Sequence, residues 1–136
     1  MDDNLVDKFK QRFSWFPKND PMYIKVTFPM SIHCDNGWFD LIWKLCEDID
    51  IVVQRESWKD FRVDQIKEKF GGLRFYVNGA NKEVFDLIHE AEAKSFKICE
   101  VCGKKGSMHV GFGWYRTICA KCAKSDPKRT WVKVKL

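Results

Sequence analysis

The sequence predicts an α+β fold, in which about three helices pack on a small, mostly antiparallel sheet and a C-terminal hairpin is held by four cysteines. Two observations predict this class. Apolar patterns with helical and strand periods alternate along residues 1–97, and two C-x-x-C pairs follow in residues 98–136. The chain has 136 residues, of which 45% are hydrophobic, enough for one core. We therefore expect an α+β domain over 1–97 with a basic module over 98–136 packed on it.

The first expected elements are a helix, a strand and a second helix. Apolar residues at helical spacing run up to Pro17, which ends the first helix, and a turn at 19–21 leads into an alternating strand at 23–28. Asp35 or Asn36 is placed to cap the second helix. The apolar positions are Leu5, Phe9, Phe13 and Phe16, then Ile24, Val26 and Phe28, then Trp38, Leu41, Ile42, Leu45 and Ile49.

Residues 66–77 have two interpretations. One is a helix that Gly71 and Gly72 break before a strand begins. The other is a hairpin with the two glycines as its turn, because glycines supply the positive φ that such turns need. The alternation on both faces favours the hairpin. The expected cross-strand pairs are Phe70–Leu73 and Ile66–Val77, with Lys67, Lys69, Arg74 and Tyr76 on the opposite face.

A third helix is expected after Asn81, whose side chain is placed to cap it. Its buried positions are Val84, Leu87, Ile88, Ala91 and Ser95. Neither Gly nor Pro separates this helix from Cys99. We therefore expect the helix to run almost directly into the C-terminal module and to position it.

The two C-x-x-C pairs predict a zinc site. They are Cys99 with Cys102 and Cys119 with Cys122, and the 16 residues between the pairs fit a known zinc spacing. Two tight turns would aim four thiolates at one ion, with Gly103 relieving the chain after the first turn. A zinc ribbon results, or a treble-clef finger if Cys122 opens a helix. An iron–sulfur cluster uses the same ligands and stays open, whereas redox-active or disulfide-bonded pairs fit this context poorly.

Catalysis is not indicated. A zinc ion with four cysteines has no open coordination position and is expected to be structural. The sequence contains no Walker loop, G-x-S-x-G or H-E-x-x-H motif. His109, between the pairs, could replace one cysteine or support the site, but it is expected to be exposed or to pack on the hairpin. His33 and Cys34 are neighbours in sequence and rarely face each other, and Cys46 is expected to be a small buried apolar group.

Basic residues are concentrated at the C-terminal end. Residues 97–136 hold ten Lys and Arg against two acidic residues, a net charge of +8, whereas residues 1–96 carry −3. Aromatic residues flanked by glycine lie between the cysteine pairs, as a surface that stacks bases and contacts phosphates requires. The candidate nucleic-acid contacts are Lys104, Lys105, Trp114, Arg116, Lys128 and Arg129. The alternative is that the aromatic residues pack the module onto the domain and the lysines serve solubility.

A family resemblance rests on several motifs between about residues 61 and 122. They are QIKEKFGGLRFY at Gln65–Tyr76, Ala91-Glu92 and Ser95 in the third helix, Cys99–Gly103, and Trp114–Cys119. Together they resemble a set of small, uncharacterised zinc-binding proteins of bacteriophages and prophages. The resemblance implies a zinc-binding accessory protein in a bacterial cytoplasm and names neither substrate nor partner.

Two functional hypotheses follow. The first is a non-enzymatic protein, stabilised by zinc, whose basic C-terminal module binds nucleic acid. The second is a phage-type effector that binds and modulates a host protein. No membrane association is expected, because no apolar stretch approaches the ~20 residues of a spanning helix, and the acidic start lacks a secretory signal. No small-molecule substrate is evident.

Overall fold

The computed structural model describes residues 1–17 and 31–135. The helices of this part are α1 (Asp3–Arg12), α2 (Phe39–Glu56), α3 (Lys82–Ser95) and α4 (Ala120–Ser125), with the 3₁₀ turn η1 (Asn36–Trp38) before α2. The strands are β1 (Ile32–His33), β2 (Arg62–Lys69), β3 (Gly72–Asn78), β4 (Ser107–Gly111), β5 (Trp114–Ile118) and β6 (Val132–Lys133). The predicted turn at 19–21 and strand at 23–28 lie outside the described residues.

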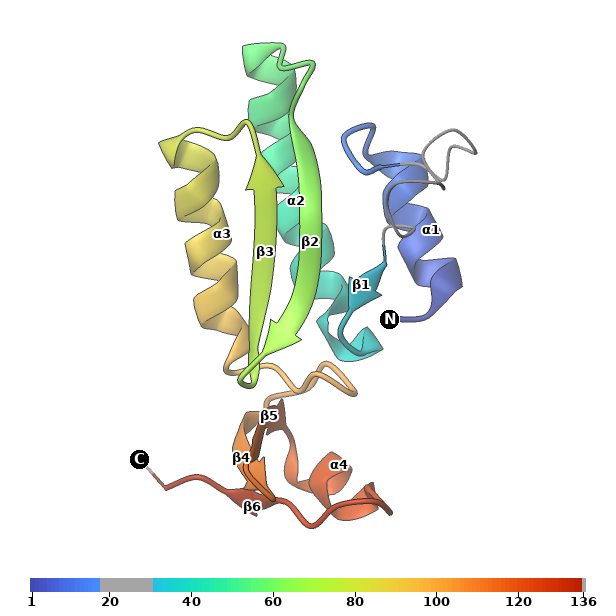
Figure 1. Ribbon diagram of the computed structural model, residues 1–136, viewed down its shortest axis with the longest axis vertical. Helices are drawn as coiled ribbons and strands as arrows, with labels where there is room; N and C mark the ends of the chain where they lie inside the picture. The colour runs from blue at the N-terminus through green and yellow to red at the C-terminus, as the bar shows by residue number, and fades with distance from the viewer. Residues whose placement is uncertain (18–30, 136) are drawn as a thin grey trace.

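The α+β prediction is confirmed. The described strands form two three-stranded sheets, ordered β1-β2-β3 and β5-β4-β6, in which only the β1–β2 pair is parallel. Helices α2 and α3 cover one face of the first sheet, and the second sheet lies with α4 beyond the β2–β3 turn (Figure 1). None of the helices in the described ranges combines the length and apolar character that crossing a bilayer requires.

The first helix is shorter than predicted. It ends at Arg12, and Phe13 is already extended, with φ −115° and ψ 112°. Leaving the helix lets the chain turn its next aromatic rings onto α2, where Phe13 lies 5.2 Å from the Trp43 ring. Phe9 and Phe16 are also buried, so three of the four predicted apolar positions belong to the core, although Phe13 and Phe16 lie beyond the helix. Leu5 is only partly buried.

The prediction that Asp35 or Asn36 caps the second helix is wrong. Neither side chain makes a capping hydrogen bond, because both have partners elsewhere. Asn36 Oδ1 accepts a hydrogen bond from the Asp2 backbone, 2.9 Å away, and the Asp35 carboxylate pairs with Arg116. The apolar stripe of α2 is confirmed, since Trp38, Ile42, Leu45 and Ile49 are buried.

The hairpin is confirmed, but its register differs from the prediction. Ile66 pairs with Phe75 and Lys69 with Gly72, so the turn is Phe70-Gly71. Both turn residues have positive φ, 53° and 85°, as a two-residue hairpin turn with this twist requires. The predicted pairs were displaced by two residues. A shift of two leaves every side chain on its own face, so the alternation could not distinguish the two registers.

Phe70 occupies a left-handed conformation that disfavours a bulky side chain, and its side chain is 67% exposed. Asn tolerates this conformation much better and suits this turn type. Phe70→Asn is therefore expected to raise the free energy of unfolding by about 1 kcal/mol. Urea denaturation measures the change. Phe85→Asn, at an exposed helical site, serves as the control, and an equal response of both variants would contradict the prediction.

The third helix agrees with its prediction. Asn81 Oδ1 accepts a hydrogen bond from Val84 N at 3.0 Å, and Val84, Ile88 and Ser95 are buried. Ser95 Oγ also accepts from Leu73 N at 2.9 Å, which attaches the end of the helix to β3. The chain then passes almost directly to Cys99, so α3 and the first sheet together position the C-terminal module.

Candidate metal centre

The first cysteine pair lies in a tight turn after α3. The Cys99 carbonyl accepts a hydrogen bond from Gly103 N at 2.9 Å, and Cys99 N donates to the Lys104 carbonyl at 2.7 Å. Gly103 has φ 80°, a left-handed conformation that a residue with a side chain adopts at a cost. The prediction that glycine relieves the chain here agrees with this geometry.

The second pair begins a helix. The β4–β5 hairpin returns the chain to Cys119, which precedes α4, and Cys122 lies within that helix. Cys122 N donates to Cys119 Sγ at 3.4 Å. A treble-clef finger has this order of elements: a turn with two cysteines, then a hairpin, then a helix that begins at the other two. Of the two architectures left open by the sequence, the structure has this one.

The four sulfur atoms fit one tetrahedral ion. All lie within 4.8 Å of one another, and Cys102 Sγ is 3.8 Å from Cys119 Sγ. Zinc–sulfur bonds of about 2.3 Å place the corners of a tetrahedron about 3.8 Å apart. A disulfide needs sulfurs about 2 Å apart, and the four cysteines are free thiols. The group can therefore hold a metal ion. Cys99 is buried, whereas Cys102 is exposed.

The electrostatics of the cluster favour a cation. The Cys122 backbone N–H lowers the pKa of Cys119 to about 7, because it donates to the sulfur that becomes charged. Burial and the three neighbouring sulfurs raise the pKa of Cys122. Four thiolates this close repel one another, so complete ionisation needs a positive ion between them.

The other cysteines and the histidine between the pairs lie outside this cluster. His109 is buried, with Nδ1 2.8 Å from the Ser107 carbonyl, and packs on the hairpin. Cys46 is completely buried in the core, as predicted. Cys34 is also buried, and desolvation raises its pKa to about 12, so it is a poor nucleophile at neutral pH.

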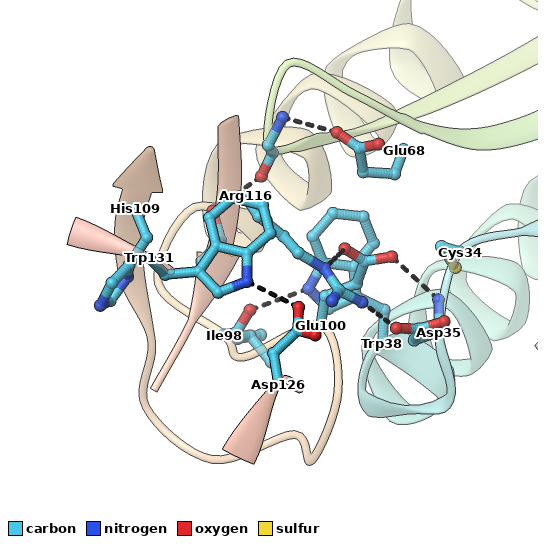
Figure 2. A network of polar contacts seen from close by, with 12 residues as sticks. Cys34, Asp35, Trp38, Glu68, Ile98, Glu100, His109, Arg116, Asp126 and Trp131 are labelled. Atoms are coloured by element: carbon cyan, nitrogen blue, oxygen red, sulfur yellow. Dashed lines mark hydrogen bonds and ion pairs between the residues drawn. The ribbon is translucent and has the colours of Figure 1, made fainter. Parts of the chain in front are cut away.

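A charged network joins the C-terminal module to the rest of the protein (Figure 2). Arg116 Nε donates to Glu100 Oε1 at 3.1 Å, and its terminal nitrogen pairs with Asp35. Glu100 Oε2 accepts a hydrogen bond from Asp35 N at 3.0 Å. The Glu100 side chain is only 6% exposed, and burial raises its pKa. The network thus connects the first cysteine turn, β5 and the segment before α2.

Backbone contacts reinforce this junction. Gly37 N donates to the Glu100 carbonyl at 2.7 Å, and a Cβ at Gly37 would lie 2.3 Å from the Cys99 carbonyl oxygen. Trp38 Nε1 donates to the Ile98 carbonyl at 2.9 Å, as Figure 2 shows. No sequence pattern indicated Gly37, although the position of Glu100 between two ligands could have suggested a role beside the site.

The candidate nucleic-acid residues do not form one uniform surface. Lys104, Lys105 and Lys128 are exposed, and Trp114 is 66% exposed. Arg129 lies beside Trp114, with its guanidinium 5.6 Å from the ring centroid. Arg116 differs, because its charge is engaged by Glu100 and Asp35 at the junction. A role for these residues in binding nucleic acid stays a prediction.

The fold and the site together define an α+β protein with a C-terminal four-cysteine group able to hold a metal ion. Comparisons with protein-family models, with curated proteins and with solved structures found no match to this chain.

Proposed function

We propose that this chain is a non-enzymatic binding protein, stabilised by zinc, whose C-terminal module contacts nucleic acid. The observation that carries the proposal is the uncompensated charge of that module. All its lysines in the described residues are exposed, whereas its two carboxylates already have partners. Glu100 binds Arg116, and Asp126 accepts hydrogen bonds from Trp131 Nε1 and Lys128 N, at 2.8 and 2.9 Å. The lysines are left for an external polyanion.

Zinc is the ion proposed for the four thiolates. Thiolate ligands in a tetrahedral array suit zinc or an iron–sulfur cluster, and the 3.8 Å sulfur spacing matches one ion bound directly. Four protein ligands leave no position for water or substrate, so the ion would stabilise the module rather than activate a reactant.

A second candidate is binding to a host protein by a phage-type accessory protein. The resemblance described above supports it, together with one observation on the surface. Phe112 lies at the β4–β5 turn with φ 49° and is 84% exposed. A bulky apolar residue in an unfavourable, exposed conformation suggests selection for contact with a partner.

The salt dependence of binding separates the two candidates. Fluorescence anisotropy with labelled oligonucleotides at several salt concentrations is expected to show an affinity that falls steeply as salt rises. The triple variant Lys104→Ala, Lys105→Ala, Lys128→Ala is expected to bind more weakly and to show a smaller slope. Lys59→Ala is the control and is expected to bind normally, because Lys59 lies in the α2–β2 loop. Figure 1 shows this loop at the opposite end of the protein from the C-terminal module.

Failure to bind any oligonucleotide at low salt would remove the nucleic-acid proposal. Binding that depends little on salt, or a triple variant that binds like Lys59→Ala, would show that the lysines are not the contact surface. In either case, affinity capture from bacterial lysate with wild type and Phe112→Ala becomes the test of the host-protein proposal.

A further inference from the structure

An open groove of about 350 Å³ lies between β5 and the segment that follows α4. Trp114, on β5, forms one wall, and Trp131, just before β6, lines the groove from the other segment. The Trp131 indole is fixed by its hydrogen bond to Asp126, which Figure 2 shows. None of the metal ligands lines this groove, so it is a separate feature of the module.

Three planar groups are already assembled in the groove. The Arg129 guanidinium lies 5.6 Å from the Trp114 ring centroid and 5.4 Å from that of Trp131. Its position is held by a hydrogen bond to the Gly111 carbonyl at 3.1 Å. Trp114 nevertheless remains 66% exposed, so much of its ring surface is free to stack on another planar group. Little ordering of side chains would be needed on binding.

The groove is close to electrically neutral. Its walls carry two carboxylates, Glu68 and Asp126, and two cations, Lys128 and Arg129. A third cation, Arg116, is already balanced at the junction. Inside the groove a phosphate group would meet as much negative as positive charge and gain little electrostatic attraction. An uncharged aromatic ring does not depend on such attraction. Lys128 lines the groove, but the other exposed lysines of the module, Lys104 and Lys105 among them, do not, and phosphates can reach them there.

We propose that this groove takes an unpaired base of single-stranded nucleic acid, which stacks on Trp114 while the phosphates contact lysines around the groove. The inference rests on the proposed function and narrows its ligand. A single strand presents neutral planar rings on a polyanionic backbone, matching a neutral aromatic groove within a basic module. A duplex covers both faces of its internal bases in the stack, so only its terminal base pairs could stack on Trp114.

The test measures the affinity of the zinc-loaded protein by fluorescence anisotropy. The probes are labelled mixed-sequence single strands of DNA and of RNA, and the comparison is a blunt duplex with the same number of phosphates. Single strands are expected to bind at least about tenfold more tightly than the duplex. Trp114→Ala is expected to weaken single-strand binding about 5- to 150-fold without changing the salt slope. Trp114→Phe should retain most of the affinity, because phenylalanine also stacks.

Two further variants locate the contacts. Lys105→Ala, at an exposed lysine outside the groove, is expected to reduce the salt slope by about 0.7, the change for one phosphate on a single strand. Phe85→Ala removes an exposed aromatic residue on α3, outside the groove, and is expected to bind like wild type. Zinc content, measured for every variant, should not change, because none of these residues is a metal ligand.

The outcomes separate this inference from the proposed function. Duplex binding as tight as single-strand binding, or a Trp114→Ala variant no weaker than Phe85→Ala, would overturn the groove as a base site. Salt-dependent binding in those same experiments would still support the proposed function. If neither single strands nor duplex bind at low salt, both proposals fail together.

Discussion

Replacing Cys119 with Ser is expected to release the metal and to unfold the C-terminal module. Structural zinc contributes apparent binding free energies of about 10–16 kcal/mol in zinc-finger peptides, comparable to or greater than the whole stability of a typical domain. None of the described residues that follow β5 is buried, so the second cysteine pair lies in a part of the module with little packing of its own. Its described helix α4 contains no buried residue, and β6 contributes only two exposed ones. With a metal ion bound, losing one of its four ligands would remove the link between the first cysteine turn and α4.

Zinc per chain, measured by mass spectrometry, and circular dichroism check this expectation. Cys46→Ala is the matched control, since Cys46 is fully buried but lies outside the four-cysteine cluster. It is expected to keep one zinc per chain. A Cys119→Ser variant that retains full zinc content and native spectra would contradict the site.

Replacing Arg116 with Ala is expected to lower the free energy of unfolding at pH 7 by about 3 kcal/mol, because it leaves the buried Glu100 carboxylate without its cation. The pKa of Glu100 is already raised by burial, and Arg116 is the main influence that lowers it. Without Arg116 this pKa rises further. The deficit is therefore largest above that pKa and shrinks as the pH falls through it, since protonation removes the unpaired charge.

Urea denaturation at pH 7 and pH 5 measures this loss and its pH dependence. Adding Glu100→Gln to Arg116→Ala should recover part of the stability at pH 7, because it removes the unpaired charge. Arg74→Ala, which loses a half-buried arginine on β3, is the control and is expected to cost no more than about 1 kcal/mol. A loss at Arg116 no larger than at Arg74, or one independent of pH, would contradict the expectation.

Local patterns predicted those parts of the fold that depend on local chemistry. The cysteine spacing predicted the four-cysteine group that can hold a metal ion. The Asn81 cap and the apolar stripe after it predicted α3, and the alternation over 66–77 predicted a hairpin. The signals for α3 and for the hairpin each lie within a short stretch of chain. The cysteine signal is a spacing that suits four ligands of one ion. The treble-clef order followed once Cys122 was found within a helix.

What local patterns missed depends on residues far apart in sequence. Asp35 is a residue type that commonly caps helices, but its carboxylate pairs with Arg116 instead. The two residues are far apart in sequence, so no local pattern could predict this pair. The hairpin register was not predicted correctly, because a shift of two residues leaves every side chain on the same face of the sheet. The turn at Phe70-Gly71 rather than Gly71-Gly72 is revealed only by the left-handed conformation of Phe70. Arg116 was proposed for a binding surface because it is a cation beside aromatic residues of the hairpin, and its ion pairs with Asp35 and Glu100 were not foreseen.

The contact at Gly37 bears on how such a protein can have arisen. Judged from the sequence alone, the segment with the two C-x-x-C pairs looks like an independent module that recombination could move from one gene to another. Here two carbonyl groups of the first cysteine turn rest where a side chain on residue 37 would be. In a chain with any other residue at that position, the side chain would clash with the first cysteine turn. The module and the segment before α2 are thus constrained to be inherited together, and chimaeras joined near residue 97 should require a glycine far upstream.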